Sequence, residues 1–115
     1  MTENHPIIFV GAGPGDPELI TVKGQKALAG ADLVLYAGSL VSPAVLGWAN
    51  PKAELVDTAK LNLADICARL MAGHRAGRRV VRVHSGDPAL FGAIQEQLEI
   101  LERENILCQV IPGVS

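Results

Sequence analysis

The feature that most constrains the fold is a regular alternation of short apolar runs with segments whose apolar residues recur at helical spacing. Continuous apolar runs of this length are typical of strands buried on both faces, as in parallel sheets. Helical segments between them provide the crossover connections that parallel strands need. The sequence therefore predicts an α/β domain with a mostly parallel five-stranded sheet flanked by helices. The expected strands are Ile7–Val10, Leu33–Tyr36, Ala53–Val56, Val80–Val83 and Cys108–Ile111.

The segment after the third strand has the clearest helical pattern. Asn62 is a good N-cap, and Gly77 is expected to end the helix. Between them one apolar face is predicted to point to the core. Its residues are Leu63, Ile66, Cys67, Leu70, Met71 and His74.

A second long helix is expected from about Pro88 to Glu104, with Glu99 and Arg103 paired on its outer side at a spacing of four residues. Its core face is expected to consist of Leu90, Phe91, Ile94, Leu98 and Leu101. A weaker helix is predicted from Thr21 to Gly30, and a short one after Pro43.

Two arginines bear on the order of the strands. Arg79 flanks the fourth strand and Arg82 interrupts it. Because arginine is rarely fully buried, the fourth strand is expected near an edge of the sheet or near a strand end.

Composition excludes several classes of protein. With 115 residues, 49% of them hydrophobic, and a net charge of −2, the chain has enough apolar surface for one folded domain and is not disordered. It lacks the basic excess and the aromatic residues of a nucleic-acid-binding surface. Its apolar runs are too short to span a membrane, and Met1–Pro6 has no basic segment, so a cytoplasmic protein without a signal peptide is expected. The spacing of its cysteines and histidines predicts no metal site.

The first loop that could bind a ligand or take part in catalysis is Val10–Pro17, which is rich in glycine and directly follows the first strand. Such a turn suggests a dinucleotide site, but Asp16 stands where the third glycine of that motif would fall. Pro14 and Pro17 also remove N–H groups that a phosphate would use. A tight turn that only connects two elements explains the loop equally well.

Three further loops follow the carboxyl ends of predicted strands, where open α/β sheets bind ligands. In His84–Pro88, helix capping by Asp87 accounts for the carboxylate without a ligand, but it does not account for Gly86. In Tyr36–Val41, small residues follow a tyrosine that either faces a ligand or ends its strand with the hydroxyl in water. In Pro112–Ser115 the chain leaves a strand and stops in a turn, which suggests that this is one half of a larger protein.

Together these loops resemble the tetrapyrrole (corrin/porphyrin) methylases. Tyr36–Val41, and His84–Pro88 with Gln95–Gln97, are most similar to the precorrin-4 and cobalt-precorrin-4 C11-methyltransferases of cobalamin biosynthesis. Other branches usually carry an Asp-Arg-Leu type segment where this chain has Ala37–Leu40. The segments that carry the family resemblance are Val10–Thr21, Ala31–Tyr36, Gly86–Gly92 and Pro112–Ser115.

The resemblance implies two α/β domains that hold S-adenosylmethionine in the cleft between them, with residues 1–115 as the amino-terminal domain. It also implies a tetrapyrrole substrate and a homodimer. Asp16 and Tyr36 lie at the same predicted edge and are candidates for contacting the tetrapyrrole or moving a proton. The resemblance implies cofactor contacts by Pro14, Ser85, Gly86, Asp87, Leu90 and Ser115.

Two alternatives stay open on the sequence. The first is another methylase of this family that acts at a different ring position. The second is a non-catalytic nucleotide-binding or assembly module.

Overall fold

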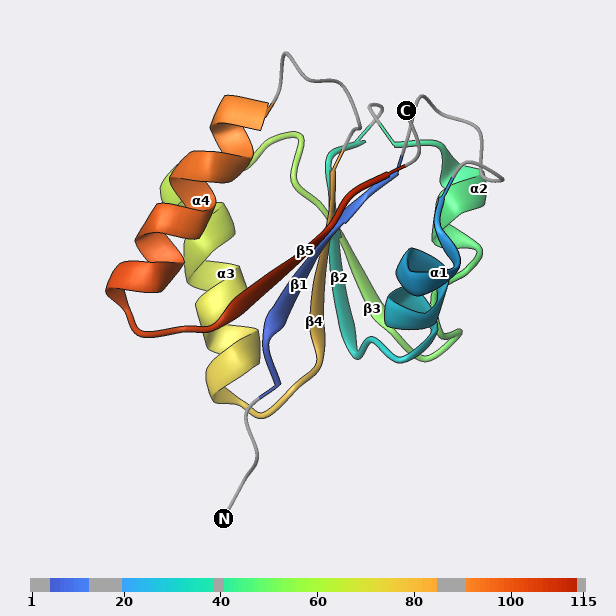
Figure 1. Cartoon of the computed structure of the whole chain (residues 1–115), viewed down its shortest axis with the longest axis horizontal. Coiled ribbons are helices and arrows are strands. Elements are labelled where there is room, and N and C mark those ends of the chain that lie inside the picture. The colour runs from blue at the N-terminus through green and yellow to red at the C-terminus, as the bar shows by residue number, and fades with distance from the viewer. Residues whose placement is uncertain (1–4, 13–19, 39–40, 85–90, 114–115) are drawn as a thin grey trace.

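A computed structural model of the chain describes residues 5–12, 20–38, 41–84 and 91–113, with side chains described from residue 94 onward in the last of these ranges. Five strands and four helices alternate along these residues, and the helices lie on both faces of one sheet (Figure 1). The elements are β1 (Ile7–Gly11), α1 (Val22–Ala29), β2 (Leu33–Tyr36), α2 (Pro43–Leu46), β3 (Glu54–Asp57), α3 (Leu63–Arg75), β4 (Val80–His84), α4 (Phe91–Arg103) and β5 (Cys108–Ile111).

All four strand pairings of the sheet are parallel, in the spatial order β3-β2-β4-β1-β5. Helices α3 and α4 cover one face, and α1 and α2 cover the other (Figure 1). The predicted fold class and all five strands are confirmed. The third strand is displaced by one residue from its predicted position, and β1 and β4 each extend one residue further.

The expected position of the fourth strand is wrong. β4 is the central strand of the sheet, and its Arg82 has only 5% of its surface exposed. The guanidinium is accommodated there because Nε donates to Oε1 of Gln97 at 3.2 Å and Nη1 donates to the carbonyl of Val83 at 3.3 Å. The aliphatic stem of arginine packs like an apolar side chain, so a charge in the sequence does not by itself indicate an edge strand.

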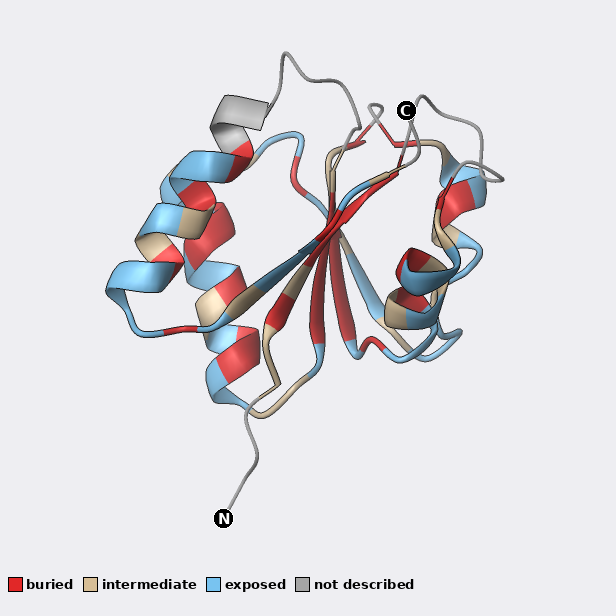
Figure 2. Cartoon of the chain, in the orientation of Figure 1, coloured by how far each residue is buried: buried red, intermediate tan, exposed pale blue. Residues whose placement is uncertain are grey.

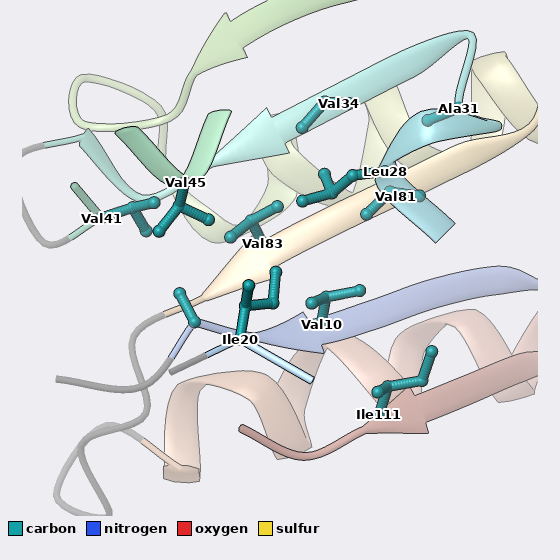
Figure 3. Packing of buried hydrophobic residues seen from close by; sticks show 11 residues of the cluster. Val10, Ile20, Leu28, Ala31, Val34, Val41, Val45, Val81, Val83 and Ile111 are labelled. Atoms are coloured by element: carbon teal, nitrogen blue, oxygen red, sulfur yellow. The ribbon is translucent and has the colours of Figure 1, made fainter. Parts of the chain in front are cut away.

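Two apolar clusters, one on each face of the sheet, form the core. Residues of one strand alternate between them, as the pleat requires: Phe9 belongs to the cluster beneath α3 and α4, and Val10 to the one beneath α1 and α2. Figure 3 shows the buried residues of the second cluster, in which helix and loop residues close over the sheet. Its labelled members are Val10, Ile20, Leu28, Ala31, Val34, Val41, Val45, Val81, Val83 and Ile111.

Helix α3 follows its sequence signals closely. The Asn62 side chain accepts a hydrogen bond from the amide of Asp65 at 2.8 Å, as an N-cap does. After the helix, Gly77 has φ of +79°, and its amide donates to the carbonyl of His74. The amide of Arg78 donates to the carbonyl of Gly73, which completes a Schellman motif. The predicted start and end are confirmed, and of the predicted apolar face Ile66, Cys67, Leu70 and His74 are buried, whereas Leu63 and Met71 are partly exposed.

Helix α4 ends in the same way, but with Asn105 in the left-handed conformation at φ of +60°. The predicted pairing of Glu99 with Arg103 is wrong, since the structure forms no ion pair between them. Its ion pairs among the described residues join elements distant in sequence, Arg75 to Glu104 at 3.4 Å and Arg78 to Glu54 at 2.9 Å. Gln97 is buried within the apolar face and was not expected there.

The two outer strands are much more exposed than the three central ones (Figure 2). Leu55 on β3 and Val110 on β5 keep 46% and 45% of their surface exposed. Within the described part of the chain, no helix is both long and apolar enough to cross a membrane.

Candidate functional site

The carboxyl edge of the sheet, where the strands end at Gly11, Tyr36, Asp57, His84 and Ile111, is the candidate site. β1 and β4 are neighbours, yet the chain goes from β1 to α1 on one face and from β4 to α4 on the other (Figure 1). In open α/β sheets, ligands bind beside such a pair, because the two connections diverge and leave a crevice between them. The loops singled out at Val10–Pro17 and His84–Pro88 start at this point.

The carboxyl ends of β1, β4 and β5 are in direct contact. Gly11 and His84 are register partners, and the amide of Ala12 donates to the carbonyl of His84 at 2.9 Å. On the other side of β1, a Cβ atom on Gly11 would lie 2.5 Å from the backbone nitrogen of Gly113. The segments that follow β1, β4 and β5 therefore start within a few ångströms of one another.

The chain uses small residues where these strand ends meet. Gly11 and Ala12 are buried, and the contact of Gly11 is with backbone, which cannot swing aside as a flexible side chain can. Any side chain at position 11 would separate β1 from the turn at Pro112 and Gly113. Such close backbone packing, with no bulky side chain at the centre, fits a crevice that accepts part of a ligand.

Tyr36 ends β2 at the same edge, with Val83 of β4 and Asp57 of β3 as its register partners. The residue is half-buried and packs against the cluster beneath α1 and α2. Its carbonyl accepts hydrogen bonds from the amide and the hydroxyl of Thr58, at 2.9 and 3.0 Å. The structure shows no hydrogen bond between the Tyr36 hydroxyl and any described residue.

The turn after Tyr36 has a structural requirement that the sequence did not reveal. Gly38 has φ of +57°, and a Cβ atom there would lie 2.9 Å from Cβ of Ala59 and 3.0 Å from Oδ1 of Asp57. That carboxylate oxygen also accepts a hydrogen bond from the amide of Ala59 at 2.8 Å. The glycine in this loop is therefore needed to pack the β2 and β3 ends together.

Tyr36 is the one predicted site residue that falls within the described ranges. The other predicted site residues lie outside them: Pro14, Asp16, Ser85, Gly86, Asp87, Leu90 and Ser115. The described residues Ala12, His84 and Gly113 lie one or two positions from Pro14, Ser85 and Ser115 in the chain and belong to the contact between the ends of β1, β4 and β5.

Two hollows on the surface of the described residues lie away from this edge. One hollow of about 230 Å³ lies beside the starts of β2 and β3, lined among others by Leu33, Glu54 and Gly73. Another of about 220 Å³ lies beneath the end of α1, next to Lys26 and Arg79. In the described part of the chain, no three His, Cys, Asp or Glu residues are grouped as metal ligands would be.

The sequence matches a family of known proteins over nearly its whole length. Residues 6–115 match the family described as Tetrapyrrole (Corrin/Porphyrin) Methylases. The chain is 47% identical over 115 residues to the cobalt-precorrin-4 C(11)-methyltransferase of Methanocaldococcus jannaschii. The aligned region covers all of this chain and 44% of that protein. The chain spans less than half the length of this relative.

Solved structures agree with the sequence match. The X-ray structure of a cobalt precorrin-4 methyltransferase, a cobalamin biosynthetic enzyme, superposes with a TM-score of 0.88 at 48% identity, over 96% of this chain and 46% of that one. The uroporphyrin-III C-methyltransferase of Thermus thermophilus, complexed with S-adenyl homocysteine, superposes with a TM-score of 0.78 at 38% identity, over the same share of each chain.

Proposed function

Because the chain belongs to the tetrapyrrole (corrin/porphyrin) methylases, we propose that residues 1–115 form the amino-terminal α/β domain of an S-adenosylmethionine-dependent C-methyltransferase. Its proposed reaction is methylation of precorrin-4 or cobalt-precorrin-4 at C11 in cobalamin biosynthesis, in a cytoplasmic homodimer that does not act on nucleic acid. The substrate follows the name of the M. jannaschii relative.

The observation that carries this proposal is the meeting of β4, β1 and β5 at their carboxyl ends. The amide of Ala12 bonds to His84, and Gly11 packs on Gly113, so three of the four loops that carry the family resemblance start from one place. A ligand of the size of S-adenosylmethionine then has loops from three strands within reach. The complex of the related T. thermophilus enzyme with S-adenyl homocysteine supports the choice of ligand.

The reaction mainly requires that its two reactants are held in the right position. Bound S-adenosylmethionine would supply an activated sulfonium methyl group, so no nucleophile of the protein is needed. Holding two reactants in line accounts for about 7–11 kcal/mol of a barrier in favourable cases. We assign cofactor contacts to Pro14, Ser85, Gly86, Asp87, Leu90 and Ser115, and substrate-side contacts to Asp16 and Tyr36.

The assignment is tested by calorimetric titration of S-adenosylhomocysteine into the complete enzyme, meaning this chain extended to the length of its relatives. Gly86→Val should weaken binding at least tenfold, because a branched side chain would occupy the place where backbone meets ligand. Asp87→Ala should weaken it as well, with a loss of about 1 kcal/mol in unfolding free energy from the capping role that the sequence predicts for Asp87. Unchanged affinity in both variants would refute the site.

A matched control is Glu54→Ala, which removes an exposed carboxylate at the start of β3, on the amino edge of the sheet and so away from the proposed site. It should leave the dissociation constant of S-adenosylhomocysteine unchanged. Incubating the enzyme with tetrapyrroles and mapping the methylated carbon then separates C11 from other ring positions. Binding of nucleotide without any methyl transfer would instead support a non-catalytic module.

A further inference from the structure

The most unusual group in the described part of the chain is the buried guanidinium of Arg82. Arg82 lies in the middle of β4, with Phe9 of β1 and Leu35 of β2 as its register partners. Its neighbours Val81 and Val83 belong to the cluster beneath α1 and α2, so the pleat directs Arg82 to the opposite face, beneath α3 and α4. A charged side chain thus lies between the central strand and two helices.

No carboxylate balances this charge among the described residues. The two hydrogen bonds of Arg82 go to neutral oxygens, Oε1 of Gln97 and the carbonyl of Val83. Burial lowers the pKa of Arg82 to about 10, so it stays charged at neutral pH. Burial also raises the pKa of the nearby Cys67 thiol, so that group supplies no negative charge at neutral pH.

Such an arrangement is expensive for stability. An ion removed from water costs several kcal/mol even after relaxation, and two neutral acceptors return part of that. Methionine at position 82 and leucine at position 97 would fill similar space at no such cost. The pair of Arg82 and Gln97 is therefore better explained by a functional role than by a contribution to stability.

The position of the pair indicates what this role is. Arg82 lies two residues before the end of β4, and Gln97 lies in α4, the next helix along the chain. The segment 85–90 connects these two elements and contains four of the residues assigned to the cofactor. A directional hydrogen bond between β4 and α4 limits how the helix slides or rotates, and so holds both ends of that segment.

We propose that Arg82 is a positioning residue for the cofactor site, because its bond to Gln97 holds β4 against α4. This inference rests on the function proposed above. Arg82 acts through the fixed contact between β4 and α4 and not through contact with the methyl group or the tetrapyrrole.

The decisive experiment compares stability with binding in the complete enzyme. The double variant Arg82→Met/Gln97→Leu should unfold at the same or a higher urea concentration than the wild type, because it replaces a buried charge by apolar contacts. Its dissociation constant for S-adenosylhomocysteine, measured by calorimetry, should nevertheless rise about tenfold, the scale on which contacting residues are coupled. A stable double variant with wild-type affinity would overturn the proposal, as would one that loses stability and affinity in proportion.

Single substitutions at Gln97 keep the test valid if the double variant does not fold. Gln97→Met removes the acceptor and should weaken binding, whereas Gln97→Glu keeps an acceptor and should bind within about twofold of the wild type. Equal affinities in these two variants would also overturn the proposal.

The matched control is Arg78→Met. Arg78 also connects separate elements, through Nη1 to Glu54 at 2.9 Å and Nη2 to the carbonyl of Asp32 at 3.0 Å, but at the amino edge of the sheet. It should leave the affinity for S-adenosylhomocysteine unchanged. If the wild-type enzyme itself does not bind S-adenosylhomocysteine, the proposed function fails, and this outcome is distinct from a failure of the Arg82 proposal.

Discussion

Tyr36 combines a buried anchor with an available hydroxyl at the candidate site. Its ring packs on the cluster beneath α1 and α2, and its carbonyl bonds to Thr58, so the position of the residue does not depend on the hydroxyl. Tyr36→Phe should therefore leave the urea midpoint of unfolding unchanged. If the hydroxyl moves a proton during methyl transfer, kcat should fall by about 10²-fold or more, which steady-state kinetics would detect. Wild-type kcat in this variant would remove Tyr36 from the reaction.

Cys108 gives the domain a pH dependence on the alkaline side. Burial is the main cause that raises its pKa from 9.0 to about 11, with the charges of Cys67 and Glu102 adding to it. The unfolded chain therefore releases this proton at lower pH than the folded one, and the stability that the thiol contributes is lost as pH rises from about 9 towards 11.

Urea unfolding at pH 9 and pH 10 tests this. These pH values lie at or below the pKa of buried Arg82, whose loss of a proton would raise the stability of the folded state instead. Stability should fall across the window, and Cys108→Ala should reduce the fall. An identical fall in this variant would show that other groups cause it.

At this scale the sequence was informative where a residue acts locally and misleading where it acts across the fold. Asn62 and Gly77 cap a helix through neighbours in the chain, so their roles follow from spacing. Arg82 and Gln97 find each other only after α4 packs on the sheet. The role of Gly38 depends on Ala59, which no local pattern connects to it.

The contact between α3 and the sheet depends on one glycine. A Cβ atom on Gly73 would lie 2.8 Å from Cδ2 of Leu33 and 2.9 Å from Cγ2 of Val80, so the helix lies very close to β2 and β4. Gly73→Ala should improve helix propensity by about 1 kcal/mol. Overpacking of two buried side chains costs about 1–3 kcal/mol, so the net effect should be destabilising.

Thermal or urea unfolding measures this balance. Gly30→Ala is a suitable control, because Gly30 follows α1 with φ of −94° and its nearest neighbour would be 3.6 Å from the new Cβ atom. That variant should be as stable as the wild type or slightly more so. A stabilised Gly73→Ala would mean that α3 can move away from the sheet at little cost.

Helices and strands could be predicted because their sequence signals are periodic and local. Which elements lie next to one another in space could not be predicted from those signals. The apolar run of β4 indicates a strand wherever it lies in a sheet, and the order β3-β2-β4-β1-β5 depends on which faces α1 and α4 cover. The candidate site followed from the same local signals, because loops after parallel strands meet at one edge. The contact of Gly11 with Gly113 needed the strand order.

At the scale of the whole molecule, the described residues form a compact body with a radius of gyration of 12.8 Å over the Cα atoms. This is close to about 13 Å for a folded domain of this size. The 115-residue chain produced by itself should therefore fold, which small-angle X-ray scattering can check. Its affinity for S-adenosylhomocysteine should be at least tenfold lower than that of the complete enzyme, because one domain supplies only part of the proposed cleft. Equal affinities would place the whole binding site in this domain.

The strand order also determines when the sheet can be completed during protein synthesis. β1 pairs with β4 and β5, so the first strand to leave the ribosome waits for a partner that lies about 70 residues further along the chain. At roughly 5–20 residues per second, this interval is roughly 4–14 s. β2 and β3 can pair much earlier, while Ile7, Phe9 and Val10 remain without their final neighbours. During synthesis this domain is therefore most exposed to aggregation at β1, until β4 has followed.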